Sequence, residues 1–250
     1  MSETKSRLIS IDRSIIPACD VETLEQLGRI VVAASGLDKV RAYKVGFSLG
    51  LTFGLPAVVE EIKSIDPDAI VIYDHQKAST DIPDTGAVFA KTMRSSGIDS
   101  AILFPQSGPV TECAYITALA DAGVHIIVGG EMTHKGYLEA DAGYLNNGAP
   151  QRMYGVAAQH GVNDFVVPGN KPDRIAEYRE FLKSFGIEPV FYSPGFIAQG
   201  GEVSDAANAA GKSWHAIVGR GVYNPNKKAD LKDVTQDEMR EALEKLVSKI

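Results

Sequence analysis

The chain has 250 residues, of which 44% are hydrophobic and 23% are charged, and its formal net charge is -7. This composition is typical of a globular protein with a sizeable core, and the negative charge argues against a nucleic-acid-binding surface. No apolar run approaches the ~18 residues of a membrane span, and no signal-peptide core follows the first residues, so we expect no membrane partner and a cytoplasmic location. Cys19 and Cys113 are expected to be reduced core residues rather than a disulfide, and the scattered histidines predict no metal site.

Apolar runs with strand character alternate with amphipathic segments along the whole chain, at a spacing of about 25–35 residues. Strands are expected at residues 14–19, 40–46, 69–73, 100–104, 124–128, 164–168, 188–192 and 214–218. Helices are expected at about residues 21–34, from 56 onward, and at 85–96, 110–122, 152–159, 172–185, 203–210 and 236–250. Eight such units predict an α/β fold, a single (β/α)8 TIM barrel over residues 1–250. A doubly wound open sheet is the alternative, although no GxGxxG motif follows the first strand.

Two segments between these elements are expected to be loops. Residues 47–54 follow the second strand, and residues 135–151 are rich in glycine and asparagine, as in a mobile loop over the strand ends. Residues 135–151 and 196–203 are the natural lids of a site at that end of a barrel.

Charged residues gather at the ends of the first three expected strands. Asp20 follows the first strand, Lys44 lies near the end of the second, and Asp74, Lys77 and Asp81 follow the third. The carboxyl ends of barrel strands converge on the face that carries the chemistry, and desolvated charges are costly unless they are paired. Opposite charges around each lysine keep both protonated, and a pair at ~4 Å is worth about 4 kcal/mol at an effective dielectric near 20. The cluster therefore predicts an ammonium held as a general acid, with a structural ion-pair network as the alternative.

Glycine-rich loops follow the seventh and eighth expected strands. Residues 193–201 precede a short helix, and Gly219 and Arg220 end the last strand. In barrels these two loops commonly bind phosphate through backbone N–H groups and a bidentate arginine. The alternative is that the glycines form tight turns only. After the fifth strand, the Thr133 hydroxyl and its neighbouring backbone could contact the edge of a planar ring.

Taken together, these motifs resemble the orotidine 5'-phosphate decarboxylase family, in its microbial branch. The resemblance implies cofactor-independent decarboxylation of orotidine 5'-monophosphate to UMP and carbon dioxide, the last step of pyrimidine nucleotide synthesis. It also implies a homodimer with shared active sites. The matching segments span nearly the whole chain: Ala18-Cys19-Asp20, Tyr43-Lys44-Val45-Gly46, residues 74–85, Glu131-Met132-Thr133, residues 193–201 and Val218-Gly219-Arg220.

The resemblance implies catalytic roles for the residues at the first strand ends. Lys77 matches the lysine that protonates C6 of the pyrimidine as carbon dioxide leaves. Asp74 matches the carboxylate beside the substrate's carboxylate, and Lys44 matches the lysine that links it to the ribose. Asp20 matches an acid that binds a ribose hydroxyl. Thr133 stands where the family usually has a serine that contacts the pyrimidine.

Other matching residues would bind the substrate from further away. Asp81 and Thr85 match residues that reach the ribose in the neighbouring subunit's site. The residues that match the family's phosphate-binding loops are Gln199, Gly200, Gly219 and Arg220.

The chain departs from the family at the third strand. The common pattern is Asp-x-Lys-x-x-Asp, whereas Asp74, Lys77 and Asp81 are each one residue further apart. Regular alternation along a strand would then turn Asp74 and Lys77 to opposite faces. We expect a β-bulge at His75-Gln76 to restore their common orientation.

Two other functions fit the same barrel. One is a magnesium-dependent sugar-phosphate lyase, of the hexulose-phosphate synthase or ketogulonate-phosphate decarboxylase type, whose related third-strand motif serves a magnesium-bound enediolate. The other is a non-catalytic nucleotide-binding protein that retains the fold. The presence of Asp74, Lys77 and Asp81 together argues against the second.

Overall fold

The eight apolar runs of the sequence form eight parallel strands in one sheet, ordered β1-β8-β7-β6-β5-β4-β3-β2. The computed structural model describes residues 7–75, 80–196 and 203–250. The sheet nearly closes, because isolated parallel bridges join Ile15 to Val40 and Ala18 to Lys44 between β1 and β2. The expected (β/α)8 barrel is confirmed, and the open doubly wound sheet is wrong. The strands are β1 (Arg13–Pro17), β2 (Ala42–Gly46), β3 (Ile70–Asp74), β4 (Ser100–Leu103), β5 (His125–Gly129), β6 (Asp164–Val166), β7 (Val190–Ser193) and β8 (Trp214–Val218).

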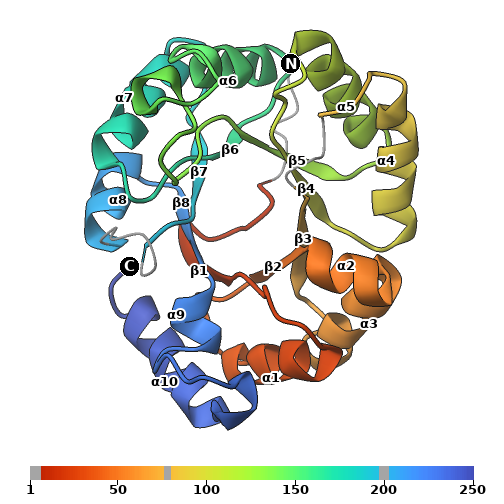
Figure 1. The fold of residues 1–250 in the computed structure, drawn as a ribbon, viewed down its shortest axis with the longest axis vertical. Helices are drawn as coiled ribbons and strands as arrows, with labels where there is room; N and C mark the ends of the chain where they lie inside the picture. Colours follow the sequence, from red (N-terminus) through yellow and green to blue (C-terminus); the bar gives the residue numbers. More distant parts are fainter. Residues whose placement is uncertain (1–6, 76–79, 197–202) are drawn as a thin grey trace.

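Helices surround this barrel, as Figure 1 shows. Helices α1 and α10 begin with capping boxes, in which Thr23 pairs with Gln26 and Thr235 with Glu238, so free N–H groups at both helix starts are bonded. The helices are α1 (Leu24–Ala34), α2 (Phe47–Phe53), α3 (Leu55–Ile65), α4 (Thr85–Ser95), α5 (Pro109–Asp121), α6 (Ala149–Gln159), α7 (Pro172–Lys183), α8 (Val203–Ala210), α9 (Arg220–Tyr223) and α10 (Gln236–Val247), with short 3-10 turns η1 (Glu139–Asp141) and η2 (Leu231–Asp233).

Two hydrophobic clusters follow from the alternation of side chains along the strands. One fills the inside of the barrel and includes Ile72 and Ile217, whereas the larger one lies between the strands and the helices and includes Tyr43 and Val45. Lys44 stands between these last two residues in β2 and therefore points into the barrel. The strand period thus decides which charged side chains reach the interior.

Three helical segments differ from the sequence-based expectation. The expected loop over residues 47–54 is wrong, because residues 47–53 form α2, which ends at Gly54 with φ 79°. Only Leu49 of this helix is buried, so its apolar pattern is too short to predict it. Helix α6 begins at Ala149 rather than at residue 152, with Pro150 in its first turn. Helix α9 follows β8 directly and is a single short turn.

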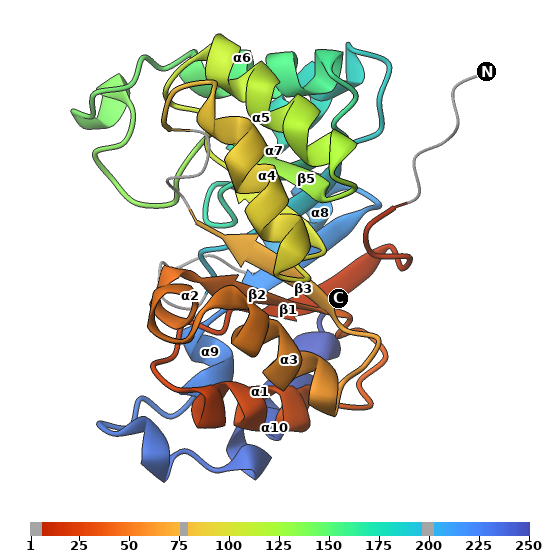
Figure 2. The same cartoon turned by 90° about the vertical axis from the view of Figure 1, so that its right-hand side faces the viewer.

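The expected mobile loop over residues 135–151 is anchored at the barrel end by its first residues. Tyr137 and Leu138 are buried, and the Tyr137 hydroxyl donates to the Gly130 carbonyl at 3.0 Å and accepts from Gln106 Nε2 at 2.9 Å. The loop contains η1 and extends outward beside α6, as the green segment in Figure 2 shows. Apolar and tyrosine side chains therefore anchor a segment whose composition alone predicts a mobile loop.

Both cysteines are free, and Cys19 is buried as expected. Cys113 is only partly buried, so its assignment to the core is wrong. Within the part of the chain that the structure describes, no helix is long and apolar enough to cross a membrane.

A polar layer crosses the inside of the barrel at the amino-terminal ends of its strands. Ser14 Oγ lies 2.8 Å from His215 Nδ1, and the Tyr192 hydroxyl donates to Asp164 at 2.8 Å. His215 is 1% exposed. Burial lowers the pKa of His215 to about 4, although the Asp164 carboxylate acts in the opposite direction. The imidazole is therefore neutral at pH 7.

We expect this histidine to make the stability of the fold depend on pH. Below about pH 6.5 the unfolded chain binds a proton at His215 that the folded protein takes up only near pH 4. Stability present above pH 6.5 is therefore lost as the pH falls toward 4, by about 3 kcal/mol. Denaturant unfolding at several pH values should show this slope in the wild type and a reduced slope in His215→Asn. The same substitution at exposed His160 is the control, and an unchanged slope in His215→Asn would contradict the prediction.

Candidate active site

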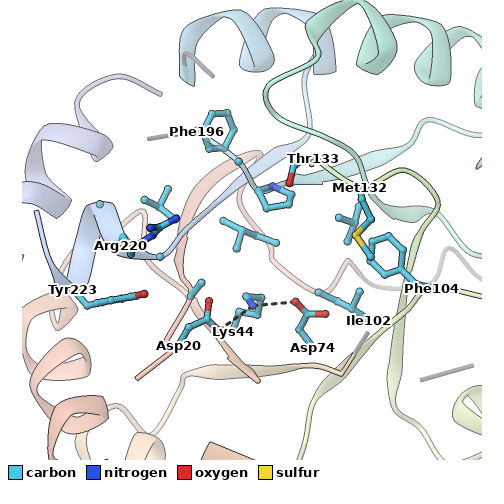
Figure 3. Close-up of a pocket in the computed structure, with 18 of the residues that line it drawn as sticks. Asp20, Lys44, Asp74, Ile102, Phe104, Met132, Thr133, Phe196, Arg220 and Tyr223 are labelled. Carbon is cyan, nitrogen blue, oxygen red and sulfur yellow. Dashed lines mark hydrogen bonds and ion pairs between the residues drawn. The ribbon is translucent and has the colours of Figure 1, made fainter. Parts of the chain in front are cut away.

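A cavity of about 270 Å³ opens at the carboxyl ends of the strands, the face on which barrel enzymes carry their chemistry. Figure 3 shows that charged side chains lie along one edge of this cavity and apolar side chains along another. The lining residues discussed below are Asp20, Lys44, Asp74, Ile102, Phe104, Glu131, Met132, Thr133, Val166, Ile217, Gly219, Arg220 and Tyr223. Six residues predicted from the sequence are thus brought together: Asp20, Lys44, Asp74, Thr133, Gly219 and Arg220.

The charged edge is a lysine between two carboxylates. Lys44 Nζ lies 3.0 Å from Asp74 Oδ2 and 3.4 Å from Asp20 Oδ1, the two contacts drawn as dashed lines in Figure 3. The side chains of Lys44 and Asp74 are 11% and 10% exposed, whereas that of Asp20 is 52% exposed. Burial alone would lower the pKa of Lys44, but the Asp74 and Asp20 carboxylates outweigh it and raise this pKa. Lys44 is therefore an ammonium at neutral pH.

One oxygen of Asp74 has no partner in the described structure. Its Oδ2 accepts from Lys44, but its Oδ1 is buried and makes no hydrogen bond with any of residues 7–75, 80–196 and 203–250. A buried carboxylate oxygen without a donor is unfavourable, so this position suits a further cation or a donor from a ligand.

A second edge of the cavity, next to Asp20, comes from β8 and α9. Arg220 is exposed, and its guanidinium makes no ion pair with a described residue. In Figure 3 this guanidinium points into the cavity, and the Tyr223 hydroxyl points toward Asp20. Burial and the Asp20 carboxylate raise the pKa of Tyr223, which keeps it protonated. The sequence gives no sign of Tyr223, since its approach depends on the short turn after β8.

An apolar wall lines another part of the cavity, and only its Met132, in the Glu131-Met132-Thr133 segment, has a counterpart among the sequence-based expectations. Its side chains come from the ends of four strands or the loops after them, and they are Ile102, Phe104, Met132, Val166 and Ile217. The other four are ordinary core residues by their pattern, so only the closed barrel shows that they share a cavity. Such a wall beside the Thr133 position suits a flat ring.

Glu131 combines burial with several charged partners. It is 3% exposed, and its carboxylate accepts from Lys171 Nζ at 2.8 Å, from Arg174 Nε at 3.0 Å and from the Tyr178 hydroxyl. Burial by itself would raise the pKa of Glu131, but these donors lower it. The carboxylate therefore stays ionised, and it ties the end of β5 to the start of α7.

Two predicted site residues lie outside this cavity. Asp81 Oδ1 accepts from the Ile82 N–H at 2.8 Å, and the Thr85 hydroxyl donates to the Ile82 carbonyl at 2.7 Å and lies 2.6 Å from the Tyr115 hydroxyl. Neither Asp81 nor Thr85 lines the cavity of its own chain.

Other predictions fall on residues outside the described part of the chain. They are Lys77, Gln199, Gly200, residues 197–202 of the expected 196–203 lid, and Gln76 of the expected bulge. His75 itself is described, and its Nδ1 lies 2.6 Å from the Tyr73 hydroxyl. In the described ranges, no group of three or more His, Cys, Asp or Glu side chains could hold a metal ion.

Comparisons with known proteins agree with this geometry. The family model described as "Orotidine 5'-phosphate decarboxylase / HUMPS family" matches residues 13–234. The chain is 32% identical to the orotidine 5'-phosphate decarboxylase of Methanosarcina mazei over 209 residues, which are 84% of this chain and 87% of that protein. It is 28% identical to the Thermoplasma acidophilum enzyme of the same name over 228 residues, which are 86% of this chain and 97% of that protein.

Solved structures give the same result. The orotidine 5'-monophosphate decarboxylase of Methanocaldococcus jannaschii, complexed with the inhibitor BMP, superposes with a TM-score of 0.75 at 25% identity and covers 94% of this chain and 98% of its own. The Pyrococcus horikoshii enzyme gives a TM-score of 0.73 at 25% identity, with the same coverage of 94% and 98%. With the family model matched over most of the barrel, the chain belongs to the orotidine 5'-phosphate decarboxylase / HUMPS family.

Proposed function

We propose that this protein decarboxylates orotidine 5'-monophosphate to UMP and carbon dioxide, with Lys77 protonating C6 and with no cofactor. The observation that carries the proposal is the Asp20–Lys44–Asp74 array, which lines one cavity together with Arg220. One cavity thus offers separate groups for the reacting base and for the phosphate of a nucleotide. The names of the relatives support the same reaction.

The charged edge suits a reaction in which a carboxylate leaves. A substrate carboxylate next to Asp74 would lie beside a like charge, and this repulsion is relieved when carbon dioxide departs. The electron pair of the broken bond remains at C6, where a nearby ammonium stabilises it before giving it a proton. Lys44 is already shared between two carboxylates, so we assign the proton donor to Lys77 and give Lys44 the task of holding Asp74 and the ribose.

The edge formed by β8 and α9 suits the phosphate. Arg220 can bind it bidentately beside Gly219. Gln199 and Gly200 are assigned to the same phosphate by their match to the family's motif. Binding energy obtained there, away from the reacting carbon, can be used to order the base next to the charged edge. The Asp20 carboxylate, which is half-exposed, is then free to accept from a ribose hydroxyl.

We expect Arg220→Ala to weaken binding of orotidine 5'-monophosphate, with kcat/KM lower by about 100-fold, because a charged hydrogen-bond partner of the phosphate is lost. Initial rates measured over a range of substrate concentrations test this. Lys212→Ala, which removes an exposed lysine at the other end of β8, is the control and should leave kcat/KM unchanged. An Arg220→Ala enzyme with wild-type KM would remove the phosphate role.

A homodimer with shared sites is part of the proposal. Asp81 and Thr85 lie outside their own cavity, which is expected if they serve a neighbour. Large apolar side chains are exposed on α2, α4, α5 and the segment before α4, on one side of the barrel (Figure 2). These exposed residues are Phe47, Leu51, Ile82, Val88 and Val110.

The experiment that tests the reaction is an ultraviolet assay of orotidine 5'-monophosphate depletion, without added metal and again after treatment with EDTA. The proposal expects UMP as product and equal rates in both conditions. Activity on a sugar phosphate that EDTA removes would instead favour the magnesium-dependent lyase. A cytoplasmic location and a single domain over residues 1–250 remain parts of the proposal.

A further inference from the structure

The segment Glu131–Thr133 forms the part of the cavity wall that follows β5, and another loop holds it in place. Glu131, Met132 and Thr133 all line the cavity. Asn170 and Lys171, which contact this segment, belong to the connection between β6 and α7 and do not line the cavity. Contacts between these two loops therefore determine where the wall stands.

Lys171 binds the segment at two points. Its Nζ donates to Glu131 Oε1 at 2.8 Å and to the Met132 carbonyl at 3.3 Å. Its neighbour Asn170 donates from Nδ2 to the Thr133 carbonyl at 3.1 Å. The carbonyls of Met132 and Thr133 thus both accept hydrogen bonds from the loop between β6 and α7.

The Glu131 carboxylate keeps Lys171 in this position. The carboxylate is buried and also accepts from Arg174 and Tyr178. Its orientation is therefore fixed, unlike that of a carboxylate in a surface ion pair. Since Arg174 also neutralises it, loss of the Lys171 charge would leave Glu131 paired. The hydrogen bond from Lys171 to the Met132 carbonyl, in contrast, is not duplicated by Arg174. A change at Lys171 should therefore release the backbone of the wall more than it destabilises the fold.

We infer that Lys171 is a positioning residue, which acts through the Glu131–Thr133 backbone to place Thr133 against the pyrimidine ring. The inference rests on the proposed function, because it assigns the ring to this wall. A fixed wall matters because a displacement of about 1 Å in a substrate-positioning group can reduce the rate roughly 100-fold. Lys171 is connected to the wall near the ring and makes no contact with Arg220 or with the charged edge.

The inference predicts a selective defect in Lys171→Met. The value of kcat/KM for orotidine 5'-monophosphate should fall roughly 10- to 100-fold, and UMP should bind more weakly by a similar factor. Binding of ribose 5-phosphate, which lacks the ring, should be unchanged, as measured by calorimetry. Lys171→Arg should restore most of the loss, because a guanidinium can donate to both the carboxylate and the carbonyl. Lys183→Met, at the exposed carboxyl end of α7, the helix that follows Lys171, is the matched control and should behave like the wild type.

A double-mutant cycle tests whether Lys171 acts through Thr133. In a Thr133→Val background the further loss from Lys171→Met should be much smaller than in the wild type, because the two changes affect one interaction with the ring. Asn170→Ala provides a second variant if Lys171→Met does not fold, and it should show the same selectivity for UMP over ribose 5-phosphate.

Equal weakening of UMP and ribose 5-phosphate, or full additivity with Thr133→Val, would overturn the inference. If the wild type decarboxylates orotidine 5'-monophosphate and Lys171→Met is unaffected, the inference about Lys171 is overturned while the proposed function stands. A wild type that binds UMP but has no decarboxylase activity would overturn the proposed function, while selective loss of UMP binding in Lys171→Met would still support the positioning role.

Discussion

Replacing Lys77 with alanine is expected to abolish decarboxylation, with kcat lower by at least about 1,000-fold, while binding of UMP stays measurable. The residue comes three positions after Asp74, whose buried Oδ1 accepts no hydrogen bond from a described residue. Lys44, the other lysine of the site, is held between two carboxylates at 3.0 and 3.4 Å. Transfer of its proton would leave both of these carboxylates without their cation, so it is a poor substitute for the missing donor.

Single-turnover kinetics and calorimetry with UMP separate the two parts of this prediction. The phosphate and ribose contacts that we propose for Arg220 and Asp20 should be retained in Lys77→Ala, so UMP binding should change far less than kcat. Lys91→Ala removes an exposed lysine from α4 and should be fully active. A Lys77→Ala enzyme with near-normal turnover would assign the C6 proton to another group.

The charged half of the site can be predicted from the sequence because it follows from two simple rules. Carboxyl ends of parallel strands converge, and side chains alternate along a strand. Lys44 illustrates both, since it lies between the outward Tyr43 and Val45 and meets Asp20 and Asp74 from the neighbouring strands. These residues follow consecutive strands of the chain, so the sequence already indicates that they lie next to one another in the barrel.

The rest of the site depends on contacts that no local pattern contains. The Glu131 carboxylate takes its cations from Lys171 and Arg174, which are 40 and 43 positions away. The apolar wall consists of residues such as Ile102 and Phe104, whose pattern is that of any barrel core. Helix α2 cannot be predicted from the sequence for a different reason. It buries only one side chain, so its apolar residues do not recur at helical spacing.

The motif that begins at the end of β3 is longer than the family pattern by one residue on each side of Lys77. Alternation turns Asp74 into the barrel, and it turns Tyr73 and His75, which lie within hydrogen-bonding distance of each other, to the other face. The bulge expected at His75-Gln76 is a prediction that extends beyond the described residues. Kinetics test the role of Lys77 as proton donor, and complementation tests which subunit's site it serves.

Mixing two inactive variants should restore activity if Asp81 acts in the neighbouring subunit's site. In a heterodimer of Lys77→Ala and Asp81→Ala chains, one site has lost both residues and the other has both. Random 1:1 assembly should therefore regenerate about a quarter of the wild-type sites, starting from almost none in either parent. Co-expression with two affinity tags allows the heterodimer to be purified and its rate compared with those of the parent homodimers.

The matched control for this experiment is a mixture of Lys77→Ala with Lys44→Ala. Lys44 lies in the cavity of its own chain, at the end of the strand next to the one that Lys77 follows, so both lysines should serve the same site. Each site of that heterodimer would then lack one lysine, and no activity should return. Recovery in the Asp81 mixture and none in the Lys44 mixture assigns Asp81 to the partner and Lys77 to the chain that holds the cavity. Failure of both mixtures, with heterodimers present, would place Asp81 in its own subunit's site and contradict the shared-site proposal.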